Sequence, residues 1–177
     1  MIRLFCDGSV NAHTHVGFGA YVMVPQNATF DSLHVKLKAF HDTSSTKLEL
    51  QTLLWAVEEC RSLSDEIVIY TDSQNIITLP SRKERFERRG YATNHKEIHE
   101  HAVLYQAFYR VMEEVNCSLV KVKGHKLECN KDAMDRYFTL VDRASREALR
   151  KSASREGFLP RKPKIKMAFL SLTWKRA

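Results

Sequence analysis

The chain has 177 residues, of which 44% are hydrophobic, enough for the core of one ordinary domain. Its net charge is +7, and the whole excess lies in residues 151–177, because the charges of residues 1–150 cancel. No apolar run is long enough to span a bilayer, and the first residues lack the basic flank and apolar stretch of a secretory signal. We therefore expect a soluble, cytoplasmic protein without membrane contact. The four cysteines form no CxxC pair, which favours reduced thiols over a zinc site.

The charge distribution divides the chain into a folded domain at residues 1–150 and a basic C-terminal tail at residues 151–177. Pro160 and Pro163 disfavour a long helix in this tail. A basic tail on a neutral body is typical of attraction to a polyanion, and a merely solubilising tail is an equal alternative.

Five segments have the patterns of β-strands. Residues 2–6, 18–24 and 33–40 predict an antiparallel meander, and the third segment alternates apolar and polar residues as a half-exposed strand does. The continuous apolar run at residues 67–70 predicts a central strand covered on both faces. A fifth strand is expected at residues 117–123.

Helical spacing of apolar residues predicts four helices between and after these strands. The first opens at Thr46, a short one runs from Ser73 to before Pro80, a long one precedes the fifth strand, and the last covers about residues 131–150. The order predicts an α/β fold in which a mixed five-stranded sheet, three strands antiparallel and two parallel, is flanked by helices.

Three carboxylates stand where this sheet is expected to present its ends. Asp7 would close the first strand, Asp72 would close the fourth, and Glu49 lies in the first turn of the first helix. Carboxylate oxygens suit hard divalent cations, so the three residues could hold metal ions. Each also has a purely structural explanation: a turn for Asp7, a capping box from Thr46 for Glu49, and a helix N-cap for Asp72.

Taken together in chain order, these segments resemble type 1 ribonuclease H. The similar stretches are Asp7-Gly8-Ser9, Gly17-Phe18-Gly19-Ala20-Tyr21, Ser45-Thr46-Lys47-Leu48-Glu49-Leu50, Tyr70-Thr71-Asp72-Ser73-Gln74 and Val122-Lys123-Gly124-His125.

The resemblance implies an endonuclease that hydrolyses the RNA strand of RNA–DNA hybrids with two Mg²⁺ or Mn²⁺ ions per site. Asp7, Glu49 and Asp72 would be metal ligands, and His125 would assist proton movement or product release. The products would carry 5′-phosphate and 3′-hydroxyl ends. We expect a monomer with no obligate protein partner, whose nucleic-acid partner is the hybrid.

The fourth carboxylate has two candidates. The commonest spacing from His125 selects Asp135, whereas the sequence around Asp142 looks more like the final Asp of the family. The two lie almost two helical turns apart, so both could occupy one face. We favour Asp142 as the catalytic metal ligand and keep Asp135 as the second choice, with Asp132 as a helix-start charge.

Contacts to the substrate are expected around the carboxylates and from a basic segment. An RNA strand is distinguished by its 2′-hydroxyls. Candidate residues for binding it are Gly8, Ser9, Asn11, Ser45, Thr46, Ser73 and Gln74. The segment Arg82–Tyr91 lies where the family carries a basic handle, which makes Arg85, Arg88 and Arg89 candidates for phosphate contacts. A solvated helix surface with internal ion pairs is the alternative.

Three further histidines precede the fifth predicted strand. His95, His99 and His101 are expected to be exposed helix histidines, because no carboxylate or cysteine completes a metal site beside them. The rivals to hybrid cleavage are a nuclease of the same fold acting on DNA structures and a non-catalytic nucleic-acid-binding domain.

Overall fold

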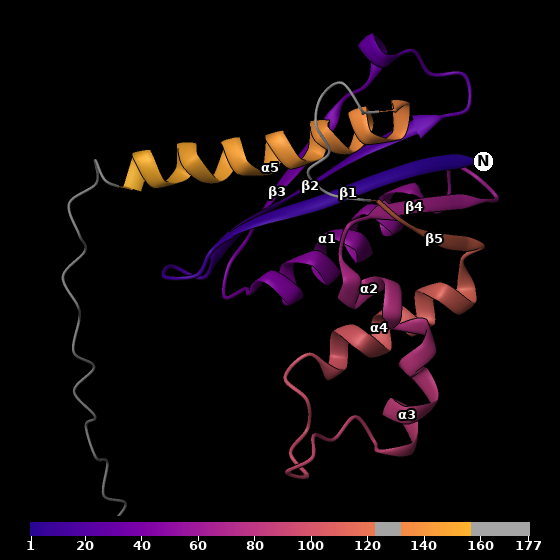
Figure 1. Cartoon of the computed structure of the whole chain (residues 1–177), viewed down its shortest axis with the longest axis vertical. Coiled ribbons are helices and arrows are strands. Elements are labelled where there is room, and N and C mark those ends of the chain that lie inside the picture. The colour runs from indigo at the N-terminus through magenta and orange to yellow at the C-terminus, as the bar shows by residue number, and fades with distance from the viewer. Residues whose placement is uncertain (123–131, 157–177) are drawn as a thin grey trace, which may run out of the picture.

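Five strands form one mixed sheet in the order β3-β2-β1-β4-β5 (Figure 1). The computed structural model describes residues 1–122 and 132–156. β1 is antiparallel to β2 and parallel to β4, β2 is antiparallel to β3, and β4 is parallel to β5. The predicted mixed sheet is therefore confirmed. The strands are β1 (Ile2–Asn11), β2 (Val16–Pro25), β3 (Val35–Phe40), β4 (Ile67–Thr71) and β5 (Cys117–Lys121).

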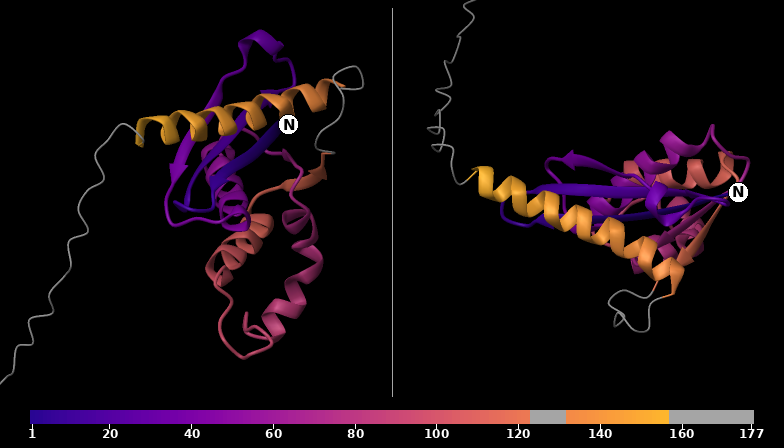
Figure 2. Two further views of the ribbon diagram at one scale, coloured as in Figure 1. Left: turned by 60° about the vertical axis from the view of Figure 1, so that its left-hand side comes forward. Right: turned by 90° about the horizontal axis from the view of Figure 1, so that it is seen from above.

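Helices cover the sheet on both faces (Figures 1 and 2). One face packs against α1 and α4, and the other packs against α5, whose Phe138 and Val141 are buried beside Phe5. No helix in the described part of the chain is long and apolar enough to cross a membrane. The helices are α1 (Ser45–Cys60), α2 (Gln74–Thr78), α3 (Lys83–Arg88), α4 (Ala102–Glu114) and α5 (Ala133–Glu156), with 3₁₀ turns at Phe30–Ser32 and Pro80–Arg82.

Successive side chains of β1 point alternately to the α1 face and to the α5 face of the sheet, as in any β-strand. Leu4 and Cys6 are buried on the α1 side, whereas Phe5 is buried on the α5 side. Asp7 follows Phe5 in this period, so its side chain lies on the α5 side of the sheet.

Glycines in the β1–β2 hairpin let α1 approach the sheet closely. A Cβ atom at Gly8 would lie 2.8 Å from Leu48 Cγ, and one at Gly19 would lie 2.2 Å from Thr52 Oγ1. Real Cβ atoms essentially never make contacts this short, so a larger residue at either position would require Leu48 or Thr52 of α1 to shift. Since Leu48 precedes Glu49, the glycines help to set the position of that carboxylate.

Some element boundaries differ from the sequence predictions. β1 does not end at Asp7 but continues to Asn11, with Asp7 opposite Ala20 of β2. β3 was predicted to be half-exposed, but its four middle residues are all exposed, and Leu37 keeps 47% of its surface accessible. β3 is an edge strand. Neither of its faces is fully covered, although apolar and polar residues alternate in its sequence.

The last helix extends further than its predicted end at about residue 150. α5 continues to Glu156, so the proposed boundary between domain and tail falls inside it. The domain boundary itself stays a prediction, since most of residues 151–177 lies outside the described residues.

Candidate active site

Asp7 lies just beyond the point where β1 and β4 separate. The parallel pairing of these strands ends at Phe5 and Tyr70, and β4 itself ends at Thr71, one residue before Asp72. β1 continues past this point because it is still paired with β2. The strand ends therefore place Asp7 and Asp72 near each other, although the reason differs from the predicted turn at Asp7.

Glu49 reaches the same region from the first turns of α1. The hydroxyl of Ser73 donates a hydrogen bond to Glu49 Oε2 at 2.5 Å, and its oxygen also accepts the N–H of Ile76 as the N-cap of α2. The cap of α1 is Ser44, whose hydroxyl accepts the N–H of Lys47. Glu49 is therefore not the partner of a capping box from Thr46, and its carboxylate is available to the site.

Asp142 lies near Asp7 because its helix, α5, contacts Asp7 through Ser145. The Ser145 hydroxyl donates to Asp7 Oδ2 at 3.4 Å and to the carbonyl oxygen of Asp142 at 3.1 Å. Arg146 pairs with Asp142, with 2.8 Å between Nε and Oδ1. The negative charge of Asp142 is also close enough to act on Asp7 electrostatically.

Asp135, the other candidate, has a structural role at the start of α5. Its N–H donates to Asp132 Oδ1 at 2.8 Å, and its Oδ2 accepts the N–H of Asp132 at 3.0 Å. These reciprocal bonds satisfy two N–H groups at a helix start. Asp135 is buried, with 6% of its surface accessible, whereas the Asp142 side chain keeps 26% accessible. The geometry thus favours Asp142 as the fourth acid of the cluster.

The negative charges of the cluster act on Asp7 and Glu49, which are partly buried, whereas Asp72 is exposed. Burial is the main cause that raises the pKa of Asp7 to about 7; the charges of Asp72 and Asp142 act in the same direction, and the Gly8 N–H and Arg146 oppose them. Burial also raises the pKa of Glu49, with Asp72 adding to the effect and the Ser73 hydroxyl opposing it. Two acids whose ionised forms are disfavoured indicate a site that a cation would stabilise.

The donor set fits a hard divalent ion, although the side chains do not converge fully. Within residues 1–122 and 132–156, no three His, Cys, Asp or Glu side chains are arranged as a ready ligand set. Like charges raise the pKa of Asp7 and of Glu49, and a cation between the carboxylates would offset that repulsion. All four side chains offer only oxygen, the donor that Mg²⁺ and Mn²⁺ prefer.

Several predicted substrate-binding residues have structural partners. Asn11 Oδ1 accepts the N–H groups of His13 and Thr14 and so shapes the β1–β2 turn. Ser73 is buried against Glu49, which makes it a positioning residue for that carboxylate. Gln74 is exposed and accepts a hydrogen bond from the Lys121 ammonium.

The other predicted residues around the carboxylates differ in exposure. Ser45 is exposed at the start of α1, and Thr46 is half-buried beside it. Gly8 and Ser9 are half-buried in β1. Ser45 also hydrogen-bonds Glu49, which lowers the pKa of that carboxyl.

The segment predicted to be a basic handle comprises the end of a 3₁₀ turn, α3 and the loop after it, and part of this segment lines a pocket. Arg82, Arg85 and Arg89 line a pocket of about 360 Å³ together with Phe86, Ala92, Thr93, Asn94 and His99. The Arg82 guanidinium donates hydrogen bonds to Asn75 Oδ1 and Thr78 Oγ1, and Arg89 donates to Asn94 Oδ1 at 2.9 Å. Arg85, Arg88 and Arg89 are exposed. Glu87 pairs with Lys83 and not with these arginines.

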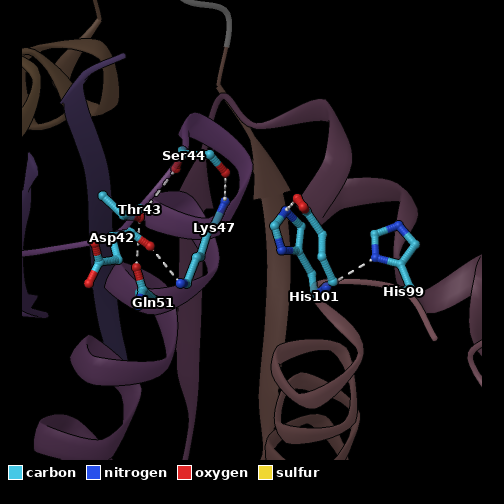
Figure 3. Close-up of polar contacts among 8 residues, drawn as sticks. Asp42, Thr43, Ser44, Lys47, Gln51, His99 and His101 are labelled. Atoms are coloured by element: carbon cyan, nitrogen blue, oxygen red, sulfur yellow. Dashed lines mark hydrogen bonds and ion pairs between the residues drawn. The ribbon is translucent and has the colours of Figure 1, made fainter. Parts of the chain in front are cut away.

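A polar pocket of about 250 Å³ lies between the start of α1 and the start of α4 (Figure 3). On the α1 side, the Lys47 ammonium donates to the carbonyl oxygen of Asp42 at 2.6 Å, and the Thr43 hydroxyl donates to Gln51 Oε1 at 2.8 Å. On the α4 side, His101 lies 2.9 Å from Glu100 Oε1. The pocket mixes charges of both signs beside the turn that carries Glu49.

The predicted helix histidines do not lie on a helix face. His95 and His99 belong to the loop before α4, and His101 is the buried N-cap residue of that helix, with 6% of its surface accessible. Its N–H donates to His99 Nδ1 at 3.1 Å (Figure 3). The expectation of exposed helix histidines is therefore wrong: none of the three lies within a helix, and only His95 is exposed, since His99 is half-buried and His101 is buried. The catalytic prediction for His125 lies outside the described residues.

Sequence reasoning missed Ser145 and Arg146. Both lie one helical turn after Asp142, a spacing that places side chains on neighbouring positions of a helix. That spacing is a signal only once Asp142 is accepted as part of the site, because nothing in the sequence joins Ser145 to Asp7, 138 positions earlier.

Comparison with known proteins gives a consistent result. A model of the family described as RNase H matches residues 1–148. No curated protein sequence matches the chain.

Solved structures also match the chain. It is similar to the PFV RNase H domain, with 13% identity, a TM-score of 0.67, and coverage of 82% of this chain and 92% of that one. It is similar to RNase H1 from the halophilic archaeon Halobacterium salinarum, with 15% identity, a TM-score of 0.59, and coverage of 85% and 98%.

A foamy viral protease–reverse transcriptase in complex with an RNA/DNA hybrid matches with 13% identity and a TM-score of 0.61; the match covers 82% of this chain but 19% of that one. At these identities the structural matches demonstrate the shared fold.

Proposed function

We propose that this chain, which belongs to the RNase H family, is a divalent-metal-dependent endonuclease that hydrolyses the RNA strand of RNA–DNA hybrids. The observation that carries the proposal is the cluster of Asp7, Glu49, Asp72 and Asp142 at the end of β4, where burial and mutual repulsion disfavour the charged form of Asp7. Such a cluster disfavours the charged form of its acids, and a bound cation would stabilise that form.

Asp7, Glu49, Asp72 and Asp142 would hold two Mg²⁺ or Mn²⁺ ions. When bound, the metals would supply an activated water and stabilise the oxygen that leaves the phosphodiester, giving 5′-phosphate and 3′-hydroxyl products. Ser73 would keep the Glu49 carboxylate oriented, since it donates to one of its oxygens at 2.5 Å. Ser145 and Arg146 would do the same for Asp7 and Asp142.

Substrate would be bound at two places around these carboxylates. Ser45 and Thr46 present hydroxyls at the start of α1, close to Glu49, where they could contact the 2′-hydroxyls that mark an RNA strand. The handle would bind phosphates through Arg85, Arg88 and Arg89, which positions the duplex without reading its sequence. We further propose that the enzyme acts in the cytoplasm as a monomer.

The test is a comparison of three labelled duplexes of one sequence: an RNA–DNA hybrid, duplex RNA and duplex DNA, each with Mg²⁺ or Mn²⁺. We expect cleavage of the RNA strand of the hybrid alone, at internal positions, with a 5′-phosphate on the product. Cleavage of duplex DNA instead would support a DNA nuclease of the same fold. Binding of all three without cleavage would support a non-catalytic domain.

A further inference from the structure

From residue 143 onward, α5 carries an exposed basic surface of which only Arg146 has a role in the proposed catalytic cluster. Between residues 143 and 154 it has four basic side chains, all exposed, and Glu147 is its single acid. The basic residues are Arg143, Arg146, Arg150 and Lys151. The match to the family covers residues 1–148, so α5 extends eight residues beyond it.

This surface starts at the carboxylate cluster. Arg146 pairs with Asp142, and the next turn continues with Arg150, whose Nε donates to the carbonyl oxygen of Arg146 at 3.3 Å. Lys151 pairs with Glu147 at 2.7 Å, an exposed ion pair that contributes little to stability. The helix therefore leads from the candidate catalytic residues outward along a row of positive charge.

Helix geometry gives this row a useful spacing. Arg143 and Arg150 are seven positions apart, so they lie on nearly the same face and about 10 Å apart along the axis. A duplex rises about 3.4 Å per nucleotide along its axis, so about 10 Å along that axis corresponds to about three nucleotide steps. The C-terminal turns of α5 also project past the edge of the sheet, at the end of the molecule opposite α3 (Figures 1 and 2).

We propose that Arg143, Arg150 and Lys151, which extend from the residue after Asp142 to the projecting C-terminal turns of α5, form a second phosphate-binding surface for the nucleic-acid duplex, across the carboxylate cluster from the handle. The positive charge of this surface and its continuity with the cluster favour a nucleic-acid duplex as the occupant, and the identity of that duplex as a hybrid rests on the proposed function. A duplex held on both sides of the cluster would be fixed in position over it.

The test is binding of a labelled hybrid of about 20 base pairs to the full chain without divalent metal, measured by fluorescence anisotropy at several KCl concentrations. The variant is Arg143→Gln/Arg150→Gln. The matched control is Arg61→Gln/Arg110→Gln, which removes the same charge from exposed positions on α1's end and on α4, across the sheet from α5. Thermal unfolding of each variant verifies the fold, and Arg150→Gln alone, in a turn beyond the family match, serves if the double variant unfolds.

We expect the α5 variant to bind about five- to tenfold more weakly at moderate salt, with a salt slope reduced by about 1 to 2, because each lost phosphate contact removes about 0.7–0.9 from it. The control should keep the wild-type values, and duplex DNA should show the same loss as the hybrid. Equal affinity and slope in variant and control would overturn the α5 surface.

Because this assay involves no cleavage, the two proposals fail separately. Wild type that binds hybrid through α5 but never cuts it would leave the α5 surface standing and remove the proposed activity. If wild type cuts hybrid while the α5 variant binds it normally, the proposed activity stands and the α5 surface is removed.

Discussion

The hydroxyl of Ser73 joins two helices at the candidate active site, because it donates to Glu49 Oε2 at 2.5 Å while its oxygen accepts the N–H of Ile76 at 3.3 Å. One side chain therefore both caps α2 and orients a carboxylate of α1. It also opposes the rise in the pKa of Glu49 that burial causes.

Ser73→Ala should lower both stability and activity. Loss of an N-cap and of a buried hydrogen bond costs about 1–2 kcal/mol of unfolding free energy, which denaturant unfolding would measure. We expect kcat on hybrid to fall, because Glu49 loses the group that orients it, while Ser73→Thr restores most of both. The control is Ser81→Ala, which removes an exposed hydroxyl that donates to the Thr78 carbonyl. A full kcat in Ser73→Ala would show that Glu49 does not depend on this bond.

Asp7→Asn should stabilise the metal-free protein at neutral pH. The ordinary pKa of 3.8 rises to about 7 in the fold, so folding favours the protonated acid. The stability that this preference provides is complete below about pH 4 and is lost as the pH rises through 7. At roughly 1.4 kcal/mol per pKa unit, the loss amounts to a few kcal/mol.

Thermal unfolding from pH 4 to 8 in EDTA checks this. Wild type should lose stability toward pH 8 relative to Asp7→Asn, and Mg²⁺ or Mn²⁺ should restore it in wild type alone. Exposed Asp65→Asn is the control and should follow wild type. If the stability of wild type and of Asp7→Asn changed with pH in the same way, the raised pKa of Asp7 would be contradicted.

The two candidates for the fourth carboxylate should separate by phenotype. Asp142→Asn should reduce hybrid cleavage at least a hundredfold with little loss of stability, because its side chain is partly accessible beside Asp7. Asp135→Asn should instead lower stability by about 1–2 kcal/mol, because it weakens the reciprocal bonds with Asp132 at the start of α5. Measuring kcat and the unfolding free energy of both variants decides between them, and inactivity of a stably folded Asp135→Asn would reverse the assignment.

The sequence predicted the sheet and three carboxylates because both depend on local patterns. Strand runs, helical spacing and the residues around Asp7, Glu49 and Asp72 can each be recognised within a few positions. The contact between Ser145 and Asp7 joins residues 138 positions apart, so it depends on how α5 crosses the sheet. The end of β1 was missed for a related reason: pairing with β2 extends the strand through Asp7-Gly8, which alone resembles a turn.

Glu59 should stabilise the fold in a pH-dependent way far from the carboxylate cluster. Its Oε2 accepts hydrogen bonds from the Lys36 ammonium at 2.5 Å and the Tyr21 hydroxyl at 2.6 Å, and these partners lower its pKa to about 2. A depressed pKa gives stability that is present above the ordinary value of 4.5 and lost as the pH falls through 2. Because the pair is largely exposed, the contribution is about 1 kcal/mol or less after solvent screening.

Chemical denaturation of Glu59→Gln and wild type at pH 7 and pH 2 checks this. The variant should be less stable at pH 7, and the difference should shrink toward pH 2. Glu58→Gln, which removes the neighbouring exposed acid, is the control and should cost less. A difference that stays constant with pH would mean that Glu59 acts through packing alone.

The most direct test of the proposed activity is the single-turnover rate of RNA-strand cleavage in a labelled RNA–DNA hybrid, measured for wild type and Asp7→Asn with saturating Mg²⁺ or Mn²⁺. We predict metal-dependent cleavage by wild type and a rate at least a hundredfold lower for Asp7→Asn, whose fold is retained. No hybrid cleavage by wild type with either metal, or equal rates for the two proteins, would contradict a nuclease that works through these carboxylates.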